Sequence, residues 1–498
     1  MGRRLGVKAQ ALRLLKPVHR YLGLGLSIIL LLWFLSGIVM MFHAYPRTAD
    51  SERVAELAEL SPGEVRLSLG EAVEQLDGDA PSSLRINQPG ERPMIQMRTP
   101  EDGWRAVYAD DGEPVAPLDE AKARSRARAL GAENIGEIEL LESGDQWTVS
   151  GHYDSWRPLW RVSVEDEQGS VWYLSQATHE KIHSTTRSER LWGYAGAVVH
   201  WIYPTQLREL SGFWRQLVMW LAGLGGLACL SGLIIGVLSL RRRRGQGMSH
   251  YRGWLLWHHY LGLAFGVLAF TWLLSGLLSM MPGYWASSDR VAPSHIEVSL
   301  GASDTGDLED WPELAELTHG KSEALSLREL EPWQFNDRNG FRAMDADGDA
   351  VFLDPEKDHH DGRPSAAEIR EAAEDVKDLE LTGFEKQKDY DNYYYPGRSE
   401  RVRGSRPPLP VYRADYEEDI QLYIDPDTGA VRYQSTPRGR ANRWLYNGLH
   451  SLDFPFLNPG SLGWYILMLA LLGVGVIFSG TGVWLTIRYL RGRSRQSG

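Results

Sequence analysis

Apolar residues are concentrated in four long windows, separated by two long polar stretches. Each window has roughly the 20 residues that a helix needs to cross a hydrocarbon core of about 30 Å. The pattern therefore predicts a membrane α-helical protein with four transmembrane helices. We place these helices at residues 19–43, 212–240, 255–282 and 461–490, with the polar stretches at 44–211 and 283–460.

The short segments at the helix ends that do not join the polar stretches are basic. They cover residues 1–18, 241–254 and 491–498, and include the run "RRRRGQGMSHYR" between the second and third helices. Short loops rich in Lys and Arg remain in the cytoplasm. The N- and C-termini are therefore predicted to be cytoplasmic, and both polar stretches are predicted to lie on the opposite side of the membrane.

Two parts of the chain repeat. "HRYLGLGLSIILLLWFLSG" resembles "HHYLGLAFGVLAFTWLLSG" and aligns His19 with His258, and "WYLSQATHEKIHSTT" over "LYIDPDTGAVRYQST" carries His200 onto His450. Each copy begins and ends on the cytoplasmic side, so the chain is expected to form two parallel repeats around an axis along the membrane normal. Matched residues near that axis should approach each other.

The polar stretches alternate short strands with tight turns. Asp-Asp-Gly at 110–112, Glu-Gln-Gly at 167–169, Ala-Asp-Gly at 346–348 and Asp-Thr-Gly at 427–429 are typical of β-hairpins. Helical runs such as "SAAEIREAAEDVKDL" follow some of these hairpins. Each polar stretch is therefore predicted to form an extracytoplasmic α+β domain.

These residues also carry a family resemblance. The hairpin "VYRADYEEDIQLYIDPDTGAVRYQST" and the paired "HRYLGL" and "HHYLGL" helices resemble the PepSY-associated transmembrane family, over nearly the whole chain. The resemblance implies PepSY-like outer domains and an iron-regulated protein of the bacterial inner membrane. It also implies haem-dependent reduction of ferric siderophores.

Five histidines stand where the predicted helices begin or end. His19 and His43 are separated by about 36 Å of helix, so they cannot share a metal ion. Imidazole is a good axial ligand for haem iron, and a macrocycle fits between facing helices. By the repeat, we pair His19 with His258 on the inner side and His200 with His450 on the outer side as ligands of two haem b groups.

His43 breaks the symmetry, because the repeat places Pro282 opposite it. It could replace one member of the outer pair as an iron ligand or bind a haem propionate, so at most four of the five histidines are axial ligands. His259 is a sixth candidate. The alternative is that all these histidines simply lie at the headgroup level, where polar tips and apolar bodies are stable.

Arginines close to the outer ends of the helices could bind haem propionates or another anion. Ordinary solvated charge explains them equally well. They are Arg187, Arg190, Arg208, Arg440 and Arg443.

Charge and cysteine content narrow the function further. The chain of 498 residues has a formal net charge of −12, which argues against nucleic acid as a partner. Cys229 is the sole cysteine, so an internal disulfide and a CxxCH haem attachment are both impossible. His359 and His360 lie in a polar turn and are expected to be exposed.

Catalytic motifs give no competing assignment. The sequence has no Walker loop or GxGxxG fingerprint, so it shows no flavin or NAD(P)H domain of its own. The favoured hypothesis is a haem-dependent ferric-siderophore reductase that takes electrons from a cytoplasmic or quinol donor. The alternative is a non-redox PepSY module that binds a peptide, a protease or a partner protein.

Overall fold

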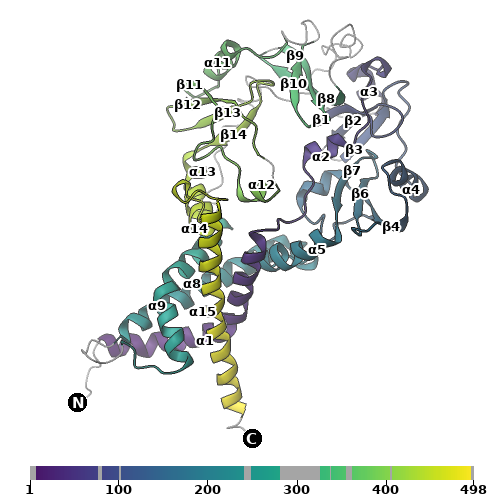
Figure 1. The fold of residues 1–498 in the computed structure, drawn as a ribbon. Coiled ribbons are helices and arrows are strands. Elements are labelled where there is room, and N and C mark those ends of the chain that lie inside the picture. Colours follow the sequence, from purple (N-terminus) through teal and green to yellow (C-terminus); the bar gives the residue numbers. More distant parts are fainter. Residues whose placement is uncertain are drawn as a thin grey trace.

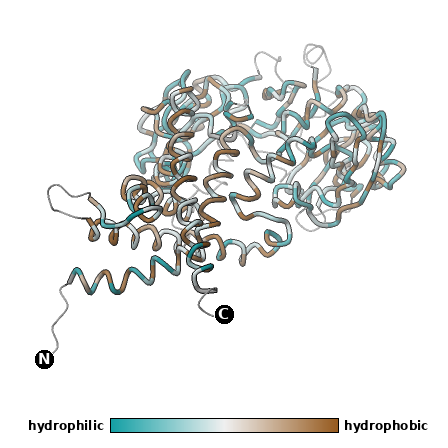
Figure 2. Tube along the Cα trace, turned by 60° about the horizontal axis from the view of Figure 1, so that its bottom comes forward, coloured by the Kyte–Doolittle hydropathy of each residue, from teal (hydrophilic) through white to brown (hydrophobic). Residues whose placement is uncertain are grey.

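The structure is a computed structural model that describes residues 7–76, 81–99, 103–240, 248–280, 326–336, 338–354, 362–403 and 406–494. Long helices form a bundle at one end of the molecule, and two lobes rich in β-strands lie at the other end (Figure 1). The helices of the bundle are largely hydrophobic, whereas the lobes mix hydrophilic and hydrophobic segments (Figure 2).

In the described part of the chain, four helices are long and apolar enough to cross a membrane, and they correspond to the four predicted windows. Helix α8 packs against α9, and α1 packs against both α8 and α15. The bounds are α1 (Val7–Met40), α8 (Ser211–Leu238), α9 (Trp254–Ser279) and α15 (Leu462–Ser494).

Helix α1 begins well before the predicted start at residue 19. Its first turns, "VKAQALRLLK", consist mostly of Ala, Leu, Lys and Arg, which favour helix but are too polar to enter an apolar window. Hydropathy alone therefore found the membrane-spanning part of the helix and missed its basic extension.

The first polar stretch forms the following elements. They are α2 (Asp50–Ala55), η1 (Pro62–Glu64), α3 (Leu69–Gln75), β1 (Ser83–Asn87), β2 (Met94–Thr99), β3 (Gly103–Tyr108), α4 (Glu120–Ala129), β4 (Ile135–Leu141), η2 (Gly151–Trp156), β5 (Leu159–Val164), β6 (Val171–Ser175), β7 (Lys181–Thr185), α5 (Arg187–Gly193), η3 (Tyr194–Val198), α6 (Val199–Trp201) and α7 (Thr205–Arg208).

The second polar stretch contains a similar series after residue 325. Its described elements are β8 (Leu327–Phe335), β9 (Arg338–Asp345), β10 (Ala350–Leu353), α11 (Ala366–Glu374), β11 (Leu381–Gln387), α12 (Arg398–Arg403), β12 (Val411–Tyr416), β13 (Gln421–Ile424), β14 (Val431–Ser435), α13 (Pro437–Asn442), η7 (Arg443–Gly448), α14 (Leu449–Ser451) and η8 (Pro455–Leu457).

Two antiparallel sheets of four strands have the same strand order, β4-β5-β6-β7 and β11-β12-β13-β14. Helix α4 packs on the first sheet through Ala123 and Ala127, and α11 packs on the second through Ile369 and Ala372. The turn glycine Gly169, between β5 and β6, has a φ of 59°, a conformation that glycine adopts without strain. The outer regions are therefore α+β, as predicted.

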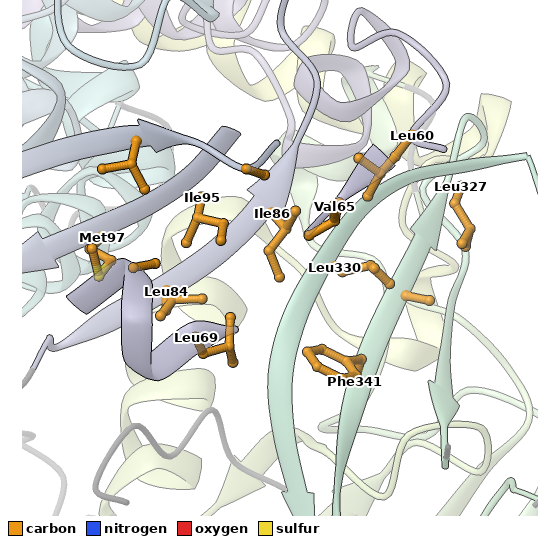
Figure 3. Packing of buried hydrophobic residues seen from close by; sticks show 14 of the residues in the cluster. Leu60, Val65, Leu69, Leu84, Ile86, Ile95, Met97, Leu327, Leu330 and Phe341 are labelled. Carbon is orange, nitrogen blue, oxygen red and sulfur yellow. The ribbon is translucent and has the colours of Figure 1, made fainter. Parts of the chain in front are cut away.

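The third sheet contains strands from both polar stretches, in the order β10-β9-β8-β1-β2-β3. Strands β1 and β8 are antiparallel, with Ile86 opposite Leu330 and Asn87 opposite Glu329. Side chains of both strands meet in one apolar core, in which Leu84, Ile86 and Leu330 are fully buried (Figure 3). The sequence assigned these strands to separate domains, and periodicity gave no sign that they pair.

A buried cluster of ions crosses the same junction. Arg53 donates two hydrogen bonds to Glu329, at 2.7 and 2.8 Å, and a third to Glu180 at 2.5 Å. Arg85 lies 3.3 Å from Glu180, and Asn87 donates to Glu329 at 2.8 Å. Because buried charges are stable only when they are paired, this cluster ties the two polar stretches together.

Removing one partner from this cluster should destabilise the protein strongly. We expect Glu329→Gln to lower the free energy of unfolding by about 3–5 kcal/mol, because the buried Arg53 and Arg85 must then share Glu180 as a counter-ion. The control is Glu374→Gln, which breaks an exposed pair with Arg370 and should change stability by about 0.5 kcal/mol or less. Equal thermal denaturation midpoints for the two purified variants would contradict this assignment.

Candidate functional site

The structure brings four of the predicted histidines together in two pairs. The ring centroids of His19, on α1, and His258, on α9, are 6.1 Å apart. Those of His200, on α6, and His450, on α14, are 6.0 Å apart. Two imidazoles that bind one metal ion from opposite sides, through bonds of about 2 Å, have centroids about 6 Å apart. Both spacings therefore suit a shared ion.

A fixed hydrogen bond orients the ring of His200. Its Nδ1 atom lies 3.2 Å from the carbonyl oxygen of Trp33 and 3.1 Å from Oγ of Ser36. A carbonyl oxygen only accepts, so Nδ1 carries the proton and Nε2 carries the lone pair. Helix α1 thus sets the tautomer of a histidine that comes from α6.

His450 has the same arrangement on the other side. Its Nδ1 lies 3.3 Å from the carbonyl oxygen of Trp272 and 3.1 Å from Oγ of Ser275, both on α9. Trp272 and Ser275 are the residues that the sequence repeat aligns with Trp33 and Ser36. The sequence analysis missed the two serines, although both stand in the repeated "W-x-L-S-G" motif.

The His19/His258 pair is oriented in the same way. His19 Nδ1 donates to the carbonyl oxygen of Ala228 at 2.9 Å. His258 Nδ1 lies 2.8 Å from the hydroxyl of Thr481, whose own proton goes to the carbonyl oxygen of Phe478 at 2.6 Å. The hydroxyl therefore accepts from Nδ1. All four histidines then share one tautomer, with the lone pair on Nε2.

The two pairs lie at opposite ends of the bundle. His19 and His258 lie in the N-terminal halves of α1 and α9 and contact Ala228 and Thr481, in the C-terminal halves of α8 and α15. His200 and His450 instead contact Trp33 and Trp272, near the ends of α1 and α9. One bundle thus holds two separate sites.

Short π-helical turns precede the two histidines of the second pair, His200 and His450. Segments η3 and η7 lead into α6 and α14, which carry His200 and His450. Each short helix then ends in a left-handed residue, Ile202 with a φ of 52° and Leu452 with a φ of 48°. π-Helical turns occur frequently at functional sites. No pattern in the sequence predicted these π-helical turns.

A cavity of about 450 Å³ lies beside the His200/His450 pair. Its walls are mainly aromatic and apolar side chains from all four long helices. Besides the two histidines they include Trp33, Phe34, Met40, Met41, Trp201, Tyr203, Trp214, Trp272, Met280, Tyr446, Trp464 and Met468.

Aromatic contacts connect the two pairs through the bundle. His258 stacks on Phe478 at 5.2 Å, and Phe478 contacts Phe265 at 6.1 Å. Phe265 contacts Trp272 at 5.7 Å, and the carbonyl oxygen of Trp272 binds His450. A continuous line of packed side chains therefore links the His258 site with the His450 site.

A comparison with protein-family models matches residues 17–334 to the PepSY-associated TM region. The match covers more than half of the chain. This chain belongs to the PepSY-associated TM family. It is a multi-pass membrane protein with four apolar helices. A comparison with curated proteins gives no significant match.

His43 and His259 have different surroundings in this PepSY-associated protein. His43 stacks on Trp192 with ring centroids 4.8 Å apart, and it is not among the residues described in the cavity wall. Both nitrogens of the buried His259 are occupied, Nδ1 by Oγ of Ser249 at 2.8 Å and Nε2 by the carbonyl oxygen of Gly236 at 2.9 Å. His259 is therefore positioned as a structural histidine. Pro282, His359 and His360 lie outside the described residues.

Among the five arginines considered from the sequence, Arg208 lies next to the cavity. Its Nε donates to the hydroxyl of Tyr203 at 3.1 Å, and its guanidinium lies 5.1 Å from the ring centroid of Trp214. Tyr203 and Trp214 both line the cavity. The others are not among the cavity-lining residues described: Arg187, Arg190, Arg440 and Arg443.

A glycine next to each histidine of the first pair offers a test of this PepSY-associated site. An added Cβ at Gly232 would lie 2.6 Å from Cε1 of His19, whereas one at Gly482 would lie 3.9 Å from Cε1 of His258. We expect Gly232→Ala to turn the His19 ring away from its partner, and Gly482→Ala to leave His258 in place. The thermal midpoint of both purified variants measures the difference. Identical behaviour would show that this contact does not position His19.

Proposed function

We propose that this protein is a di-haem b electron-transfer protein of the bacterial inner membrane that reduces ferric siderophores on the periplasmic side. The observation that carries the proposal is the geometry of the two histidine pairs. Each pair has the spacing for axial ligation, and each ring has its lone pair on Nε2. Bound haem supplies one-electron chemistry at iron, which these side chains do not have themselves.

The residues around the His200/His450 pair fit a macrocycle. No group of three or more His, Cys, Asp or Glu side chains in metal-binding distance occurs in the described part of the chain. A metal ion at either pair then needs its remaining donor atoms from a ligand, and a macrocycle brings four. The cavity beside His200 and His450 has the size and the aromatic lining that protein sites use for cofactors.

The protein's own contribution is orientation. A hydrogen bond from Nδ1 to a carbonyl or hydroxyl oxygen fixes the ring and makes Nε2 a better donor. For His200 and His450 the accepting oxygens belong to α1 and α9, the helices that also carry His19 and His258. A shift of α1 or α9 would therefore disturb both sites, which couples the position of one pair to the other.

Repeat symmetry supports the pairing. Residues that the repeat matches lie opposite each other within each pair. Trp33 and Ser36 contact Nδ1 of His200, and Trp272 and Ser275 contact Nδ1 of His450 in the same way. This is the arrangement expected if the chain forms two parallel repeats around a common axis. In this proposal the His19/His258 pair faces the cytoplasm.

The substrate assignment follows from iron chemistry and from the family resemblance. One electron from a cytoplasmic or quinol donor converts the Fe(III) of the chelate to Fe(II). Hard oxygen ligands such as those of siderophores hold Fe(II) less tightly, so reduction releases the metal. The outer domains are the parts of the chain that could contact such a chelate.

Substitution of the histidines tests the proposal. We expect His200→Ala and His450→Ala to lose one of two haems and the reduction of an external ferric chelate, and His19→Ala and His258→Ala to lose the other haem. Haem content of the purified proteins and trapping of Fe(II) measure the two effects. The control is His250→Ala, an exposed histidine outside both pairs. Haem-free wild-type protein from haem-replete cells would favour the non-redox PepSY module instead.

Reporter fusions test the orientation. A reporter inserted next to Gly362 should read as periplasmic, and one fused to the C-terminus should read as cytoplasmic, because the short basic segments remain inside. The two readings come from one chain in the same cells, so expression level does not affect the comparison. Both reporters on one side of the membrane would rule out the four-span orientation.

A further inference from the structure

Two arginines from opposite halves of the chain lie close to the backbone of Tyr45. Arg403, the last residue of α12, donates from Nη2 to the carbonyl oxygen of Tyr45 at 3.0 Å. Arg47 follows two residues later, and both guanidinium groups are exposed. Helix α12 lies on the side of the second lobe that faces the first lobe (Figure 1). Like charges repel, so the proximity of Arg47 and Arg403 calls for an explanation.

Two buried polar groups of the first lobe have no hydrogen-bond partner among the described residues. They are the hydroxyl of Tyr153, which is 2% exposed, and Nε2 of His183, which is 0% exposed. Their rings are 5.2 Å apart. Burial raises the pKa of Tyr153 to about 12, and the positive charges of Arg47 and Arg403 oppose this rise.

His183 presents a donor. Burial lowers its pKa to about 4, so the ring is neutral at pH 7. The hydroxyl of Thr48 accepts from the backbone N–H of Ser184 at 3.2 Å and lies 2.9 Å from Nδ1 of His183. When this hydroxyl donates its proton to Nδ1, the ring proton is on Nε2. Tyr153, His183 and the two arginines then all offer donors.

The nearby carboxylates are engaged elsewhere. Asp50 pairs with Arg53 at 3.3 Å, and Glu52 accepts the backbone N–H of Ala49 at 2.9 Å. Glu400 accepts the backbone N–H of Gly397 at the start of α12. These contacts leave the carboxylate charges in place, but none of them is an ion pair with Arg47 or Arg403, so the two guanidinium groups keep donors for an anionic ligand.

One layer of aromatic rings separates these donors from the cavity. The ring of Tyr45 lies 5.8 Å from that of Trp201 and 6.0 Å from that of Tyr203, and both of these residues line the cavity. The backbone of the same Tyr45 accepts the hydrogen bond from Arg403. A ligand held by the arginines is therefore close to the His200/His450 site.

We propose that Arg47 and Arg403, with the hydroxyl of Tyr153 and Nε2–H of His183 beneath them, form the docking site for an anionic ferric chelate. The identity of the ligand rests on the proposed function, whereas the anionic character follows from the donors. Negatively charged oxygen atoms suit this set, because charge-assisted hydrogen bonds to arginine are the strongest that the site can make.

Binding to the full-length protein in nanodiscs of neutral lipid, without reductant, tests the proposal. The probes are an anionic ferric tris-catecholate and a cationic ferric trihydroxamate, followed by quenching of tryptophan fluorescence. We expect wild-type protein to prefer the anionic chelate. Arg47→Gln and Arg403→Gln should each weaken its binding about tenfold or more, and Arg403→Glu should shift the preference towards the cationic chelate. Unchanged affinities would overturn the proposal.

Two further variants separate docking from other roles. Arg363→Gln is the matched control, because Arg363 is exposed and pairs with Asp427 far from this surface. Tyr153→Phe removes one buried donor and should weaken the anionic chelate a few-fold; a higher thermal midpoint with unchanged affinity would exclude Tyr153 from the site.

Two further outcomes distinguish chelate docking from lipid binding and from reduction of the chelate. If the arginines bind a phospholipid headgroup instead, their Gln variants will retain less anionic lipid and keep full affinity for the chelate, which overturns the proposal. His200→Ala should bind the chelate normally without reducing it. Wild-type protein that binds the anionic chelate but never reduces it would contradict the proposed function and leave the docking site standing.

Discussion

The structure depends on the buried pairing of Arg53 and Arg85 with Glu180 and Glu329. These four charges come from both polar stretches and lie out of contact with water, so each needs the others to remain ionised and stable. Burial raises the pKa of Glu329, but Arg53 and Arg85 outweigh this effect and hold it at about 2. The stabilisation is therefore complete above the ordinary value of 4.5 and is lost as the pH falls towards 2. At neutral pH the two outer regions act as one body.

This body positions the functional site. His200 and His450 follow the last strands of the two matching sheets, and the junction between the halves brings these sheet ends over the same bundle. Each ring is then held by a backbone carbonyl of a membrane helix. The geometry of the His200/His450 pair therefore depends on two parts of the molecule. The sheets determine where each histidine lies, and the membrane helix fixes its tautomer. In the His19/His258 pair, by contrast, helices of the bundle do both.

Much of this arrangement could be predicted from local signals. Apolar length predicted the four spans, turn residues such as Gly169 predicted the hairpins, and the repeat predicted which histidines approach each other. The sequence could not predict that β1 pairs with β8, because strand pairing between distant segments leaves no periodic trace. It also could not separate His259 from the pairs, since its two hydrogen bonds depend on tertiary contacts. Thr481 was missed because His19, the repeat equivalent of His258, is anchored by the backbone carbonyl of Ala228, a contact that any residue type can make.

The pairing of β1 with β8 also determines when the shared sheet can be completed during synthesis. Strand β1 and Arg53 are synthesised before α8 and α9, whereas β8 and Glu329 come after them. At about 5–20 residues per second this interval lasts on the order of tens of seconds. During that time the first outer domain has an unpaired sheet edge and a buried arginine that lacks one counter-ion. Until the chain has crossed the bilayer twice more, this edge is open to chaperones, to proteases and to other nascent chains.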